Sequence, residues 1–342
     1  MDFGFNDEQQ AIKETAREML TARSPFAKVR EAAEARAYDD ALWAEIRGLG
    51  WPGIAVAEEH GGQGLGMVEL AILCEELGYA CAPSPFLSNA SAGLFVEHAG
   101  SDEQRERWLP GIASGEERGA VAFEPRSNEL VVDADGAVVL VLNDSDRAVL
   151  AEAGEATIEP IELIDATRSF ARVSTSVGDE LSGDVEGAAD RTVVALAAEL
   201  TGVAQRAMEM AVEYAKERQQ FDRPIGAYQA VSHRCAGMLY DVEEARSLAY
   251  YAAWTADAEP ESLPIAASMA KARASDAAWR VTNDALQVLG GIGFTWEHDL
   301  HFLLKRARVG AGLLGDSRMH RDRVATLAGL GAAEPEAAAI EA

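Results

Sequence analysis

The chain has 342 residues and a formal charge of −27 at neutral pH, from 30 basic and 57 acidic side chains. This excess of acid argues against a nucleic-acid binder, which needs a clustered basic face, and against docking on an anionic membrane. No apolar run reaches the roughly 18 residues of a membrane-spanning helix, and the first ten residues lack the basic and apolar regions of a signal peptide. We therefore expect a cytoplasmic protein.

The three cysteines are Cys74, Cys81 and Cys235. Their number is odd, none forms a CxxC pair, and none alternates with histidine at zinc spacing. The sequence therefore supports neither a disulfide framework nor a metal site, and we expect the three side chains to be small buried apolar groups.

The first unit, residues 1–118, has the pattern of an α-helical domain. Asn6 precedes a run of acidic and amide residues, which is typical of a helix N-cap. Ile12, Ala16 and Met19 then recur at helical spacing.

The second unit, residues 119–187, has the pattern of short strands. The apolar stretches 130–132 and 137–142 are separated and followed by turn-forming pairs, Asp135-Gly136 and Asn143-Asp144. This pattern predicts a small β domain.

The strand region is also the most acidic part of the chain. Residues 121–190 contain 16 acidic side chains, four arginines and no lysine, a net charge of −12. Such a run usually forms a solvated face.

The third unit, residues 188–330, predicts a C-terminal four-helix bundle. Apolar residues keep a helical rhythm in one segment at Val203, Ala207, Met210 and Tyr214, and in another at Ala274, Ala278, Val281, Ala285 and Val288. Two further helical segments are Tyr228 to Ala256 and Leu300 to Gly329. The alanine-rich tail 331–342 has little to bury, so we expect it to be disordered.

Two motifs carry more specific information. The first, RQQFDRPIGAYQ, spans residues 218–229 at the junction of two bundle helices, and the second, QVLGGIGF, spans 287–294. An arginine at a helix end offers a fixed fork of donors for a pyrophosphate. Consecutive glycines allow a backbone to approach a dinucleotide closely.

Both motifs resemble flavin-binding signatures of the acyl-CoA dehydrogenase family, RxxFGxxIxxxQ and QxxGGxGF. Four further segments resemble the family in the same order along the chain: FNDEQQAIKETARE from residue 5, AEEHGGQGLG from 57, EELG from 75 and DEQRERWLPGIASGE from 102. The resemblance implies an α+β, mainly α fold, with an N-terminal helical domain, a shortened middle β domain and a C-terminal four-helix bundle.

The resemblance also implies an FAD cofactor shared across a subunit interface, because in this family the bundle helices complete the FAD site of a neighbouring subunit. The residues that match the cofactor-binding positions are Arg218, Phe221, Gln229, Gln287, Gly290 and Gly291.

The sequence departs from the family in its middle region, which is little more than half the usual size. The family's TEP loop is recognisable at residues 122–125, but Arg126, Ser127 and Asn128 follow where a glycine-serine-aspartate turn is expected. Residues 139–152 contain no tryptophan where the family places one beside the flavin ring. The chain thus keeps the residues that it would lend to a neighbour's FAD and lacks those that would hold its own.

The catalytic base is the second departure. Dehydrogenation needs a carboxylate to remove the acidified α-proton. The two family positions of this base correspond to Leu314 and Thr192, neither of which is acidic. Three carboxylates lie near these positions: Asp316, which can also be a helix N-cap; Glu199, two helical turns from Thr192; and Glu297, beside the flavin glycines. Asp316 is the candidate catalytic residue of this chain.

The preferred interpretation is one subunit of a heteromeric α2β2 FAD-dependent acyl-CoA dehydrogenase. A longer partner subunit would supply the catalytic glutamate and the loops around the flavin ring. By resemblance, the substrate is an acyl-CoA thioester of β-oxidation or lipid metabolism, with steroid side-chain degradation as one case, and an electron-transfer flavoprotein takes the electrons. One alternative is a self-sufficient homo-oligomeric dehydrogenase with Asp316 as base. Another is a non-catalytic scaffold subunit.

The charge of the strand region adds a further expectation. CoA carries a 3′-phosphate and a pyrophosphate, so a domain with a net charge of −12 is a poor clamp for it. We expect the acyl-CoA site to lie on the partner.

Overall fold

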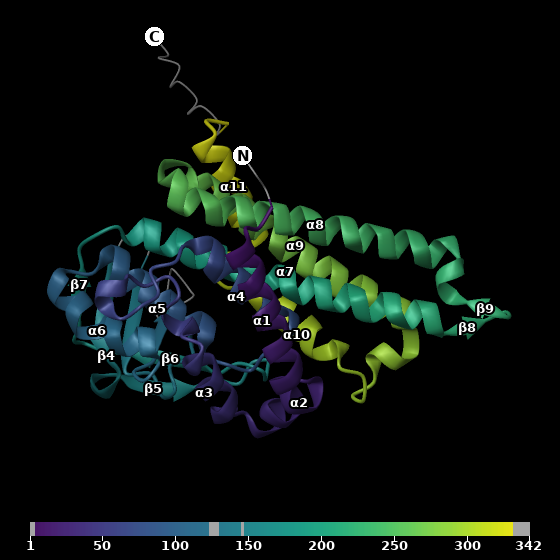
Figure 1. Cartoon of the computed structure of the whole chain (residues 1–342), viewed down its shortest axis with the longest axis horizontal. Helices are drawn as coiled ribbons and strands as arrows, with labels where there is room; N and C mark the ends of the chain where they lie inside the picture. The colour runs from purple at the N-terminus through teal and green to yellow at the C-terminus, as the bar shows by residue number, and fades with distance from the viewer. Residues whose placement is uncertain (1–3, 123–129, 145–146, 331–342) are drawn as a thin grey trace, which may run out of the picture.

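The structure is a computed structural model that describes residues 4–122, 130–144 and 147–330. Helices of the N-terminal part pack beside a sheet, and three long helices extend to one side of both (Figure 1). The predicted mainly helical α+β fold is confirmed. The sequence-predicted TEP loop with the departures after it, and the tail 331–342, lie largely or wholly outside the described residues.

The N-terminal part is helical, as predicted. Its longer helices are α1 (Asp7–Arg23), α2 (Phe26–Ala35), α3 (Asp40–Gly48), α4 (Met67–Tyr79), α5 (Phe86–Ala99) and α6 (Asp102–Ser114), with the short 3-10 turns η1 (Trp51–Gly53) and η2 (Glu58–His60) between them. Asn6 caps α1 as predicted: its side chain accepts a hydrogen bond from the Gln9 backbone N–H, and the Gln9 side chain accepts one from the backbone N–H of Asn6.

The strand region forms one seven-stranded sheet in the order β5-β6-β2-β1-β3-β4-β7. The strands are β1 (Gly119–Ala122), β2 (Val131–Val132), β3 (Val139–Asp144), β4 (Arg147–Glu152), β5 (Thr157–Pro160), β6 (Phe170–Ser174) and β7 (Asp179–Leu181), with η3 (Ala153–Glu155) between β4 and β5. Only β1 and β3 pair in parallel; the other described pairs are antiparallel. Alternate residues of β3 pack into two different cores, Val139 and Val141 into the main one and Leu140 into a smaller one, which is the two-residue period of a strand buried on both faces.

One predicted turn is wrong in position. Asn143 and Asp144 do not form a turn: β3 continues through both, and they pair with Ala148 and Arg147 of β4. The Asp135-Gly136 turn is confirmed, with Gly136 at a φ of 74°.

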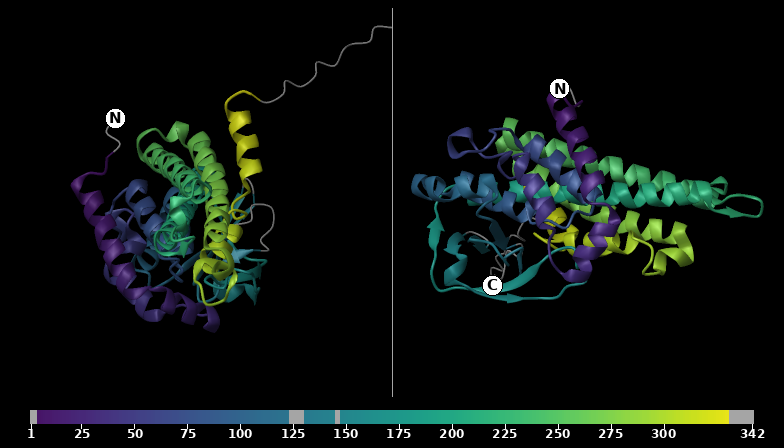
Figure 2. Two further views of the ribbon diagram at one scale, coloured as in Figure 1. Left: turned by 90° about the vertical axis from the view of Figure 1, so that its right-hand side faces the viewer. Right: turned by 60° about the horizontal axis from the view of Figure 1, so that its bottom comes forward.

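The C-terminal part contains the predicted long helices. They are α7 (Val185–Glu217), α8 (Gln229–Ala258), α9 (Leu263–Leu289), α10 (Leu300–Gly310) and α11 (Ser317–Leu327), with a small hairpin of β8 (Gln219–Gln220) and β9 (Arg223–Pro224) and the 3-10 turns η4 (Ile225–Ala227), η5 (Pro260–Ser262) and η6 (Gly290–Phe294). The predicted apolar row of α9 is buried from Ala274 to Val288. Figure 2 shows α7, α8 and α9 as the long bundle in two further views.

The last predicted helix, Leu300 to Gly329, is wrong as one element because it is two. The chain leaves the helical conformation between α10 and α11, where Leu314 and Gly315 have φ values of 57° and 95°. A left-handed conformation at two successive residues cannot continue a right-handed helix. Three glycines within residues 310–315 are the sequence signal for this break.

The domain limits stay predictions. The elements nearest to them are α6 and β1 at the first limit, and β7 and α7 at the second; α7 begins at Val185, just before residue 188.

Candidate functional site

The first flavin motif lies where α7 ends and α8 begins. Arg218 is the C-cap of α7, and its exposed guanidinium forms no ion pair with any described carboxylate. The β8–β9 hairpin follows. Phe221 and Asp222 at its tip both have positive φ values, 53° and 63°, and the Phe221 ring is 87% exposed. An apolar ring held in solvent on a strained turn indicates a contact outside this chain.

Gln229 opens α8 on the same side of the bundle. Its exposed side chain lines an open groove of about 580 Å³ between α8 and α9, together with Arg234, Tyr240 and Asp284. The ion pair between Arg234 and Asp284 ties the start of α8 to the end of α9. The start of α8, which holds the end of the first motif, and the end of α9, which leads into the second, are therefore in contact.

The second motif covers the end of α9 and the turn η6. Gln287 is exposed, and Gly290 has φ 61° and ψ −136°, a conformation open essentially to glycine alone. A Cβ built on Gly290 or Gly291 would meet no atom of this chain within 4 Å. The backbone here faces open space, so a large flat group can approach it closely.

These observations fit an FAD at this end of the bundle. In Figure 1 the hairpin, the start of α8 and the end of α9 lie at the far end of the three long helices from the sheet. The end carries a free guanidinium at Arg218, amide side chains at Gln229 and Gln287, and uncovered glycine backbone at Gly290 and Gly291. Such groups suit a pyrophosphate and an adenine or isoalloxazine ring.

The candidate base Asp316 lies elsewhere, at the start of α11. It is the N-cap of that helix, and its carboxylate accepts a hydrogen bond of 2.8 Å from the Met319 backbone N–H. It is exposed to solvent. The carboxylate is therefore held by a helix terminus and lacks the dry pocket that would tune it as a base.

The position that matches the family base, Leu314, is buried and apolar. Its carbonyl oxygen accepts a hydrogen bond of 2.9 Å from Nε2 of the buried His320. The other family position, Thr192, is fully buried, and its hydroxyl donates to the Ala188 carbonyl on its own helix. Neither position offers a proton acceptor to a substrate.

A buried amine supports the loop between α10 and α11. Lys271 on α9 is 0% exposed, and its Nζ donates to the Ser275 hydroxyl and to the carbonyl oxygens of Ala311 and Gly315 at 2.9, 3.3 and 3.1 Å. Burial lowers the pKa of Lys271 to about 7, and the Asp316 carboxylate partly opposes this. Sequence analysis missed this residue, because one lysine in an alanine-rich helix has no motif.

The second candidate, Glu199, is locked in a buried ion-pair network. Its two carboxylate oxygens accept from Arg306, at 2.8 Å, and from Arg168. Arg306 also donates to Asp165 and Thr167. With both oxygens engaged by guanidinium groups, Glu199 cannot serve as a free base.

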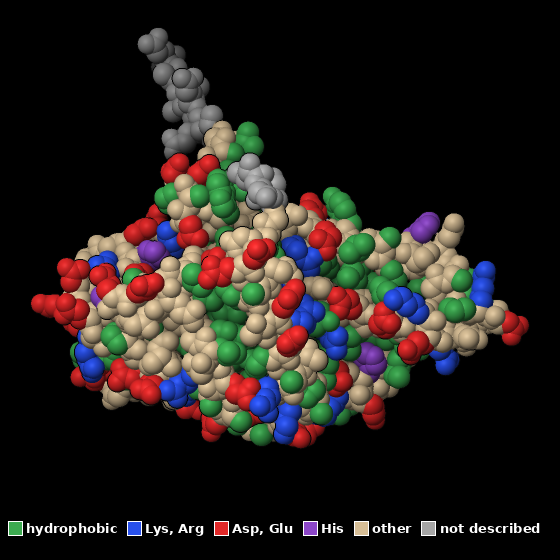
Figure 3. Space-filling model, in the orientation of Figure 1, with side chains coloured by type: hydrophobic (Ala, Val, Ile, Leu, Met, Phe, Trp, Pro, Cys, Tyr) green, Lys and Arg blue, Asp and Glu red, His purple; other side chains and the backbone are tan. Residues whose placement is uncertain are grey.

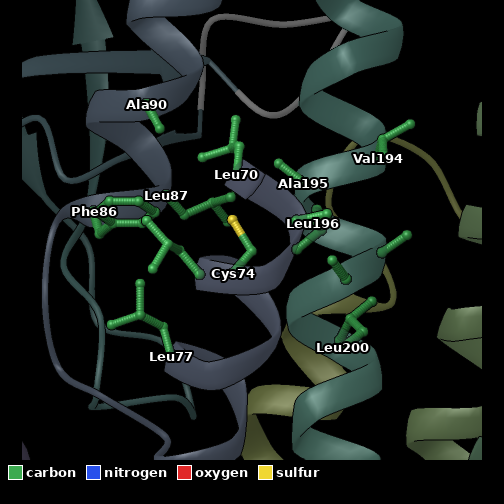
Figure 4. Packing of buried hydrophobic residues seen from close by; sticks show 14 of the residues in the cluster. Leu70, Cys74, Leu77, Phe86, Leu87, Ala90, Val194, Ala195, Leu196 and Leu200 are labelled. Atoms are coloured by element: carbon green, nitrogen blue, oxygen red, sulfur yellow. The ribbon is translucent and has the colours of Figure 1, made fainter. Parts of the chain in front are cut away.

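The interior around this network is closed. In Figure 4, Leu77 and Phe86 lie on one side of the view and Leu196 and Leu200 on the other, with Cys74 between them, and all five belong to the main core. The pocket that remains between α4, α5, α7 and α10 has a volume of about 10 Å³. It cannot hold an acyl chain.

The third candidate, Glu297, is exposed beside η6 and forms no ion pair with any described basic group.

The predicted cysteine environment is confirmed for Cys74 and Cys81, which are buried, whereas Cys235 is only half-buried. None of the helices described is long and apolar enough to cross a membrane.

Comparison with known proteins identifies the family. The acyl-CoA dehydrogenase N-terminal domain family matches residues 6–116, and the acyl-CoA dehydrogenase C-terminal domain family matches residues 186–328. The acyl-CoA dehydrogenase IpdE2 of Mycobacterium tuberculosis is 35% identical over 314 residues, which cover 91% of this chain and 94% of IpdE2. The chain belongs to the acyl-CoA dehydrogenase family. Its enzyme class is that of oxidoreductases acting on CH–CH bonds, in a family that generally binds FAD.

Other acyl-CoA dehydrogenases extend the comparison. FadE34 of Mycobacterium tuberculosis is 37% identical over 305 residues, which cover 84% of this chain and 42% of FadE34. The solved structure of the Tcur3481-Tcur3483 steroid acyl-CoA dehydrogenase G363A variant matches with a TM-score of 0.88 and 27% identity, covering 96% of this chain and 99% of that one. The ChsE4-ChsE5 complex of Mycobacterium tuberculosis shares the fold, with a TM-score of 0.88 at 23% identity, covering 97% and 100%. Structures similar to this chain thus include heteromeric complexes of the family.

Proposed function

We propose that this chain is one subunit of a heteromeric FAD-dependent acyl-CoA dehydrogenase and lends the bundle half of an FAD site to a longer catalytic partner. One observation carries the proposal: Arg218, Gln229, Gln287 and the Gly290-Gly291 backbone gather at one exposed end of the bundle, where the described part of the chain offers their side chains no ion pair and leaves the glycine backbone uncovered. A ligand and a second chain would supply the hydrogen-bond partners that these polar groups lack and would cover the open glycine backbone.

The proposed roles follow from the chemistry of each group. FAD supplies the hydride acceptor for oxidation of a Cα–Cβ bond. Arg218 would bind its pyrophosphate as a permanent cation, and Gln229 and Gln287 would hydrogen-bond its polar edges. Gly290 and Gly291 would let the backbone approach without a Cβ. Phe221 would pack against the partner subunit.

The assignment of the base to the partner rests on the four positions already described. Leu314 and Thr192 carry no carboxylate, Asp316 caps a helix, and Glu199 is paired on both oxygens. A base at Asp316 or Glu199 would have to leave a structural role, and Glu297, although unpaired, is exposed to solvent and lacks the dry pocket that tunes a carboxylate as a base. A glutamate on the partner requires no such change.

The acyl-CoA site, like the base, is assigned to the partner. The described clefts include an acidic one of about 370 Å³, lined by Glu58, Glu97 and Asp257, which would repel CoA phosphates. On the face in Figure 3, acidic side chains crowd the left-hand end, over the strand region. We therefore place the acyl-CoA site on the partner. A steroid side-chain CoA thioester is the proposed substrate, by similarity to the Tcur3481-Tcur3483 steroid enzyme, and an electron-transfer flavoprotein is the proposed electron acceptor.

The decisive experiment is the ratio of FAD to protein chains, measured by absorbance and mass for this chain alone and co-expressed with a longer dehydrogenase encoded beside it. We expect a colourless protein alone and one FAD per two chains in the complex. One FAD per chain from the protein alone would contradict the shared site and favour a self-sufficient enzyme.

A matched pair of variants separates a shared site from a scaffold. Arg218→Ala should lower the FAD content of the purified complex at least fivefold, whereas Arg172→Ala, at an exposed arginine of β6, should leave it unchanged. Full FAD content and activity in Arg218→Ala would mean that this chain only stabilises its partner.

A further inference from the structure

A further cleft, away from the flavin motifs, is lined by residues of α1, α2, α4 and α7 and of the segments between them. These helices lie near the centre of the view in Figure 1. Its volume is about 300 Å³. Arg17 and Glu76 come from α1 and α4, Ser24 and Phe26 from the α1–α2 junction, and Arg206 from α7. Helices of the N-terminal part and the first helix of the C-terminal part therefore build its walls.

Arg206 is the available cation of this cleft. It is half-buried and forms no ion pair with any described carboxylate. Its Nη1 donates to the Tyr79 hydroxyl at 3.1 Å, and its guanidinium carbon lies 5.1 Å and 5.5 Å from the centres of the Tyr79 and Phe26 rings. Since a guanidinium has five N–H donors, most of them remain free for an anion.

The single carboxylate among the lining residues is already neutralised, and Glu209, beside the cleft, accepts a hydrogen bond from the Tyr79 hydroxyl. Glu76 is fully buried and accepts from Arg17 through both oxygens, and Lys13 lies 2.9 Å from it. The guanidinium of Arg17 also stacks on Tyr79, 3.4 Å from the ring centre. The lining residues thus carry a net positive charge in a chain whose total is −27.

Two hydrogen-bonding features independent of charge point to the same occupant. Ser24 is 4% exposed, and its Oγ has no hydrogen-bond partner among the described residues. Directly after it, the ten-residue helix α2 begins at Phe26 with no side chain capping its N-terminus and no acidic residue in its first turn. A buried orphan hydroxyl and an uncapped helix start are both satisfied by an anion.

We propose that this cleft binds a small flat organic molecule with one phosphate or carboxylate group. The anionic group would be held by Arg206, the Ser24 hydroxyl and the N-terminus of α2. The flat part would lie against the Phe26 ring. The cleft is separate from the flavin end, because Arg206 precedes Arg218 by 12 residues, about 18 Å along α7.

The proposal is tested by isothermal titration of the full chain, as purified with its partner, with phenyl phosphate, benzoate and inorganic phosphate. We expect saturable binding of one phenyl phosphate or benzoate per chain, with inorganic phosphate weaker because it leaves the aromatic wall uncovered. Which of the two aromatic anions binds more tightly identifies the headgroup. No binding of any probe at 10 mM, roughly the weak limit for a small specific ligand, would overturn the proposal.

Variants locate the binding. Arg206→Gln keeps the length of the side chain and should weaken binding about tenfold or more, which is the effect of losing a charged hydrogen bond. Arg206→Lys keeps the positive charge but lacks the planar guanidinium with its several N–H donors, so it should bind the aromatic anion with intermediate affinity. Ser24→Ala should bind it severalfold more weakly. Arg318→Gln, at an arginine 89% exposed on α11, is the control and should bind normally. Equal binding by Arg206→Gln and the control, with unchanged melting temperatures, would place the anion elsewhere and contradict the proposal.

Discussion

The closed interior between α4, α5, α7 and α10 and the far end of the bundle use similar side chains in opposite ways. In the interior, Arg168 and Arg306 are buried and paired with Glu199, and the pocket between these helices has a volume of only about 10 Å³. At the bundle end, Arg218 is exposed and unpaired, and Phe221 is 87% exposed.

The difference separates residues that hold this chain together from residues offered to another molecule. A buried guanidinium must be paired, because an uncompensated charge in the interior is costly. An exposed one beside uncovered glycine backbone contributes little to the stability of its own chain. Substitutions in the interior should therefore change folding, and those at the bundle end should change assembly and FAD binding.

The largest effect is expected for Arg306→Ala. It removes the partner of Glu199, Asp165 and Thr167 in the interior, and should lower the free energy of unfolding by about 3–5 kcal/mol in urea titrations. The control Arg36→Ala breaks an exposed ion pair with Glu162 and should cost less than about 1 kcal/mol. If Arg306→Ala abolished activity with unchanged stability, the interior would be a functional site.

The next effect is a loss of stability in acid. Burial lowers the pKa of His320 and of His98 to about 4, and for His320 the neighbouring Lys271 and Arg323 act in the same direction. Because the unfolded chain takes up these protons near pH 6.5 and the folded chain near pH 4, stability should fall as the pH drops between these values, by up to about 3 kcal/mol for the fully buried His320.

A titration of melting temperature from pH 7.5 to 4.5 measures this loss, and His320→Asn should reduce its slope. Asp133 acts in the opposite direction, because burial raises its pKa to about 6 and favours its protonated form in the folded state. A slope unchanged in His320→Asn would exclude that histidine as a cause.

A smaller effect is expected at Asp316, where two substitutions distinguish a cap from a base. Asp316→Asn keeps a capping side chain and should leave the activity of the complex within about threefold, whereas a lost general base typically costs about 10²–10⁴-fold. Asp316→Ala should lower stability by about 1 kcal/mol through loss of the bond to Met319. A hundredfold loss of activity in Asp316→Asn would favour the self-sufficient enzyme.

The smallest effect is expected for Phe221→Gly, which should raise the stability of this chain and weaken its binding to the partner. Phe221→Gly relieves a left-handed conformation and should stabilise the purified chain by about 1 kcal/mol in thermal melts. The same change removes the exposed ring and should weaken association with the partner in a pull-down titration. Unchanged association would show that Phe221 lies outside the interface.

Much of the fold follows from local signals in the sequence. The helix N-cap at Asn6, the Asp135-Gly136 turn and the apolar row along α9 are encoded within a few residues, and each was predicted correctly. The break between α10 and α11 was predicted only in part: Asp316 was recognised as a possible helix N-cap, but Leu300 to Gly329 was still predicted as one helix. The conformation of Leu314 and Gly315 is supported by hydrogen bonds to their carbonyl oxygens from Lys271, which lies far away in the sequence, and from His320, which lies in the next helix.

The residues of the candidate site likewise fall into those that the sequence predicts and those that it does not. The motif residues at 218–229 and 287–294 were found from sequence because they form contiguous patterns. The network of Glu199 and Arg306 was missed because its members are 107 residues apart. One signal was available: Arg306 falls on the apolar face of α10 between Leu303 and Gly310, where a charge must have a buried partner.

That network also constrains how the protein can evolve. The network has four charged members, Asp165, Arg168, Glu199 and Arg306, which come from three separate segments and neutralise one another. A single substitution at any of them leaves a buried charge without its partner and destabilises the protein, whereas replacement of all of them by apolar residues of similar volume can be neutral or stabilising. The four positions should therefore change together across lineages, and the interior that they close should reopen only through coordinated substitutions.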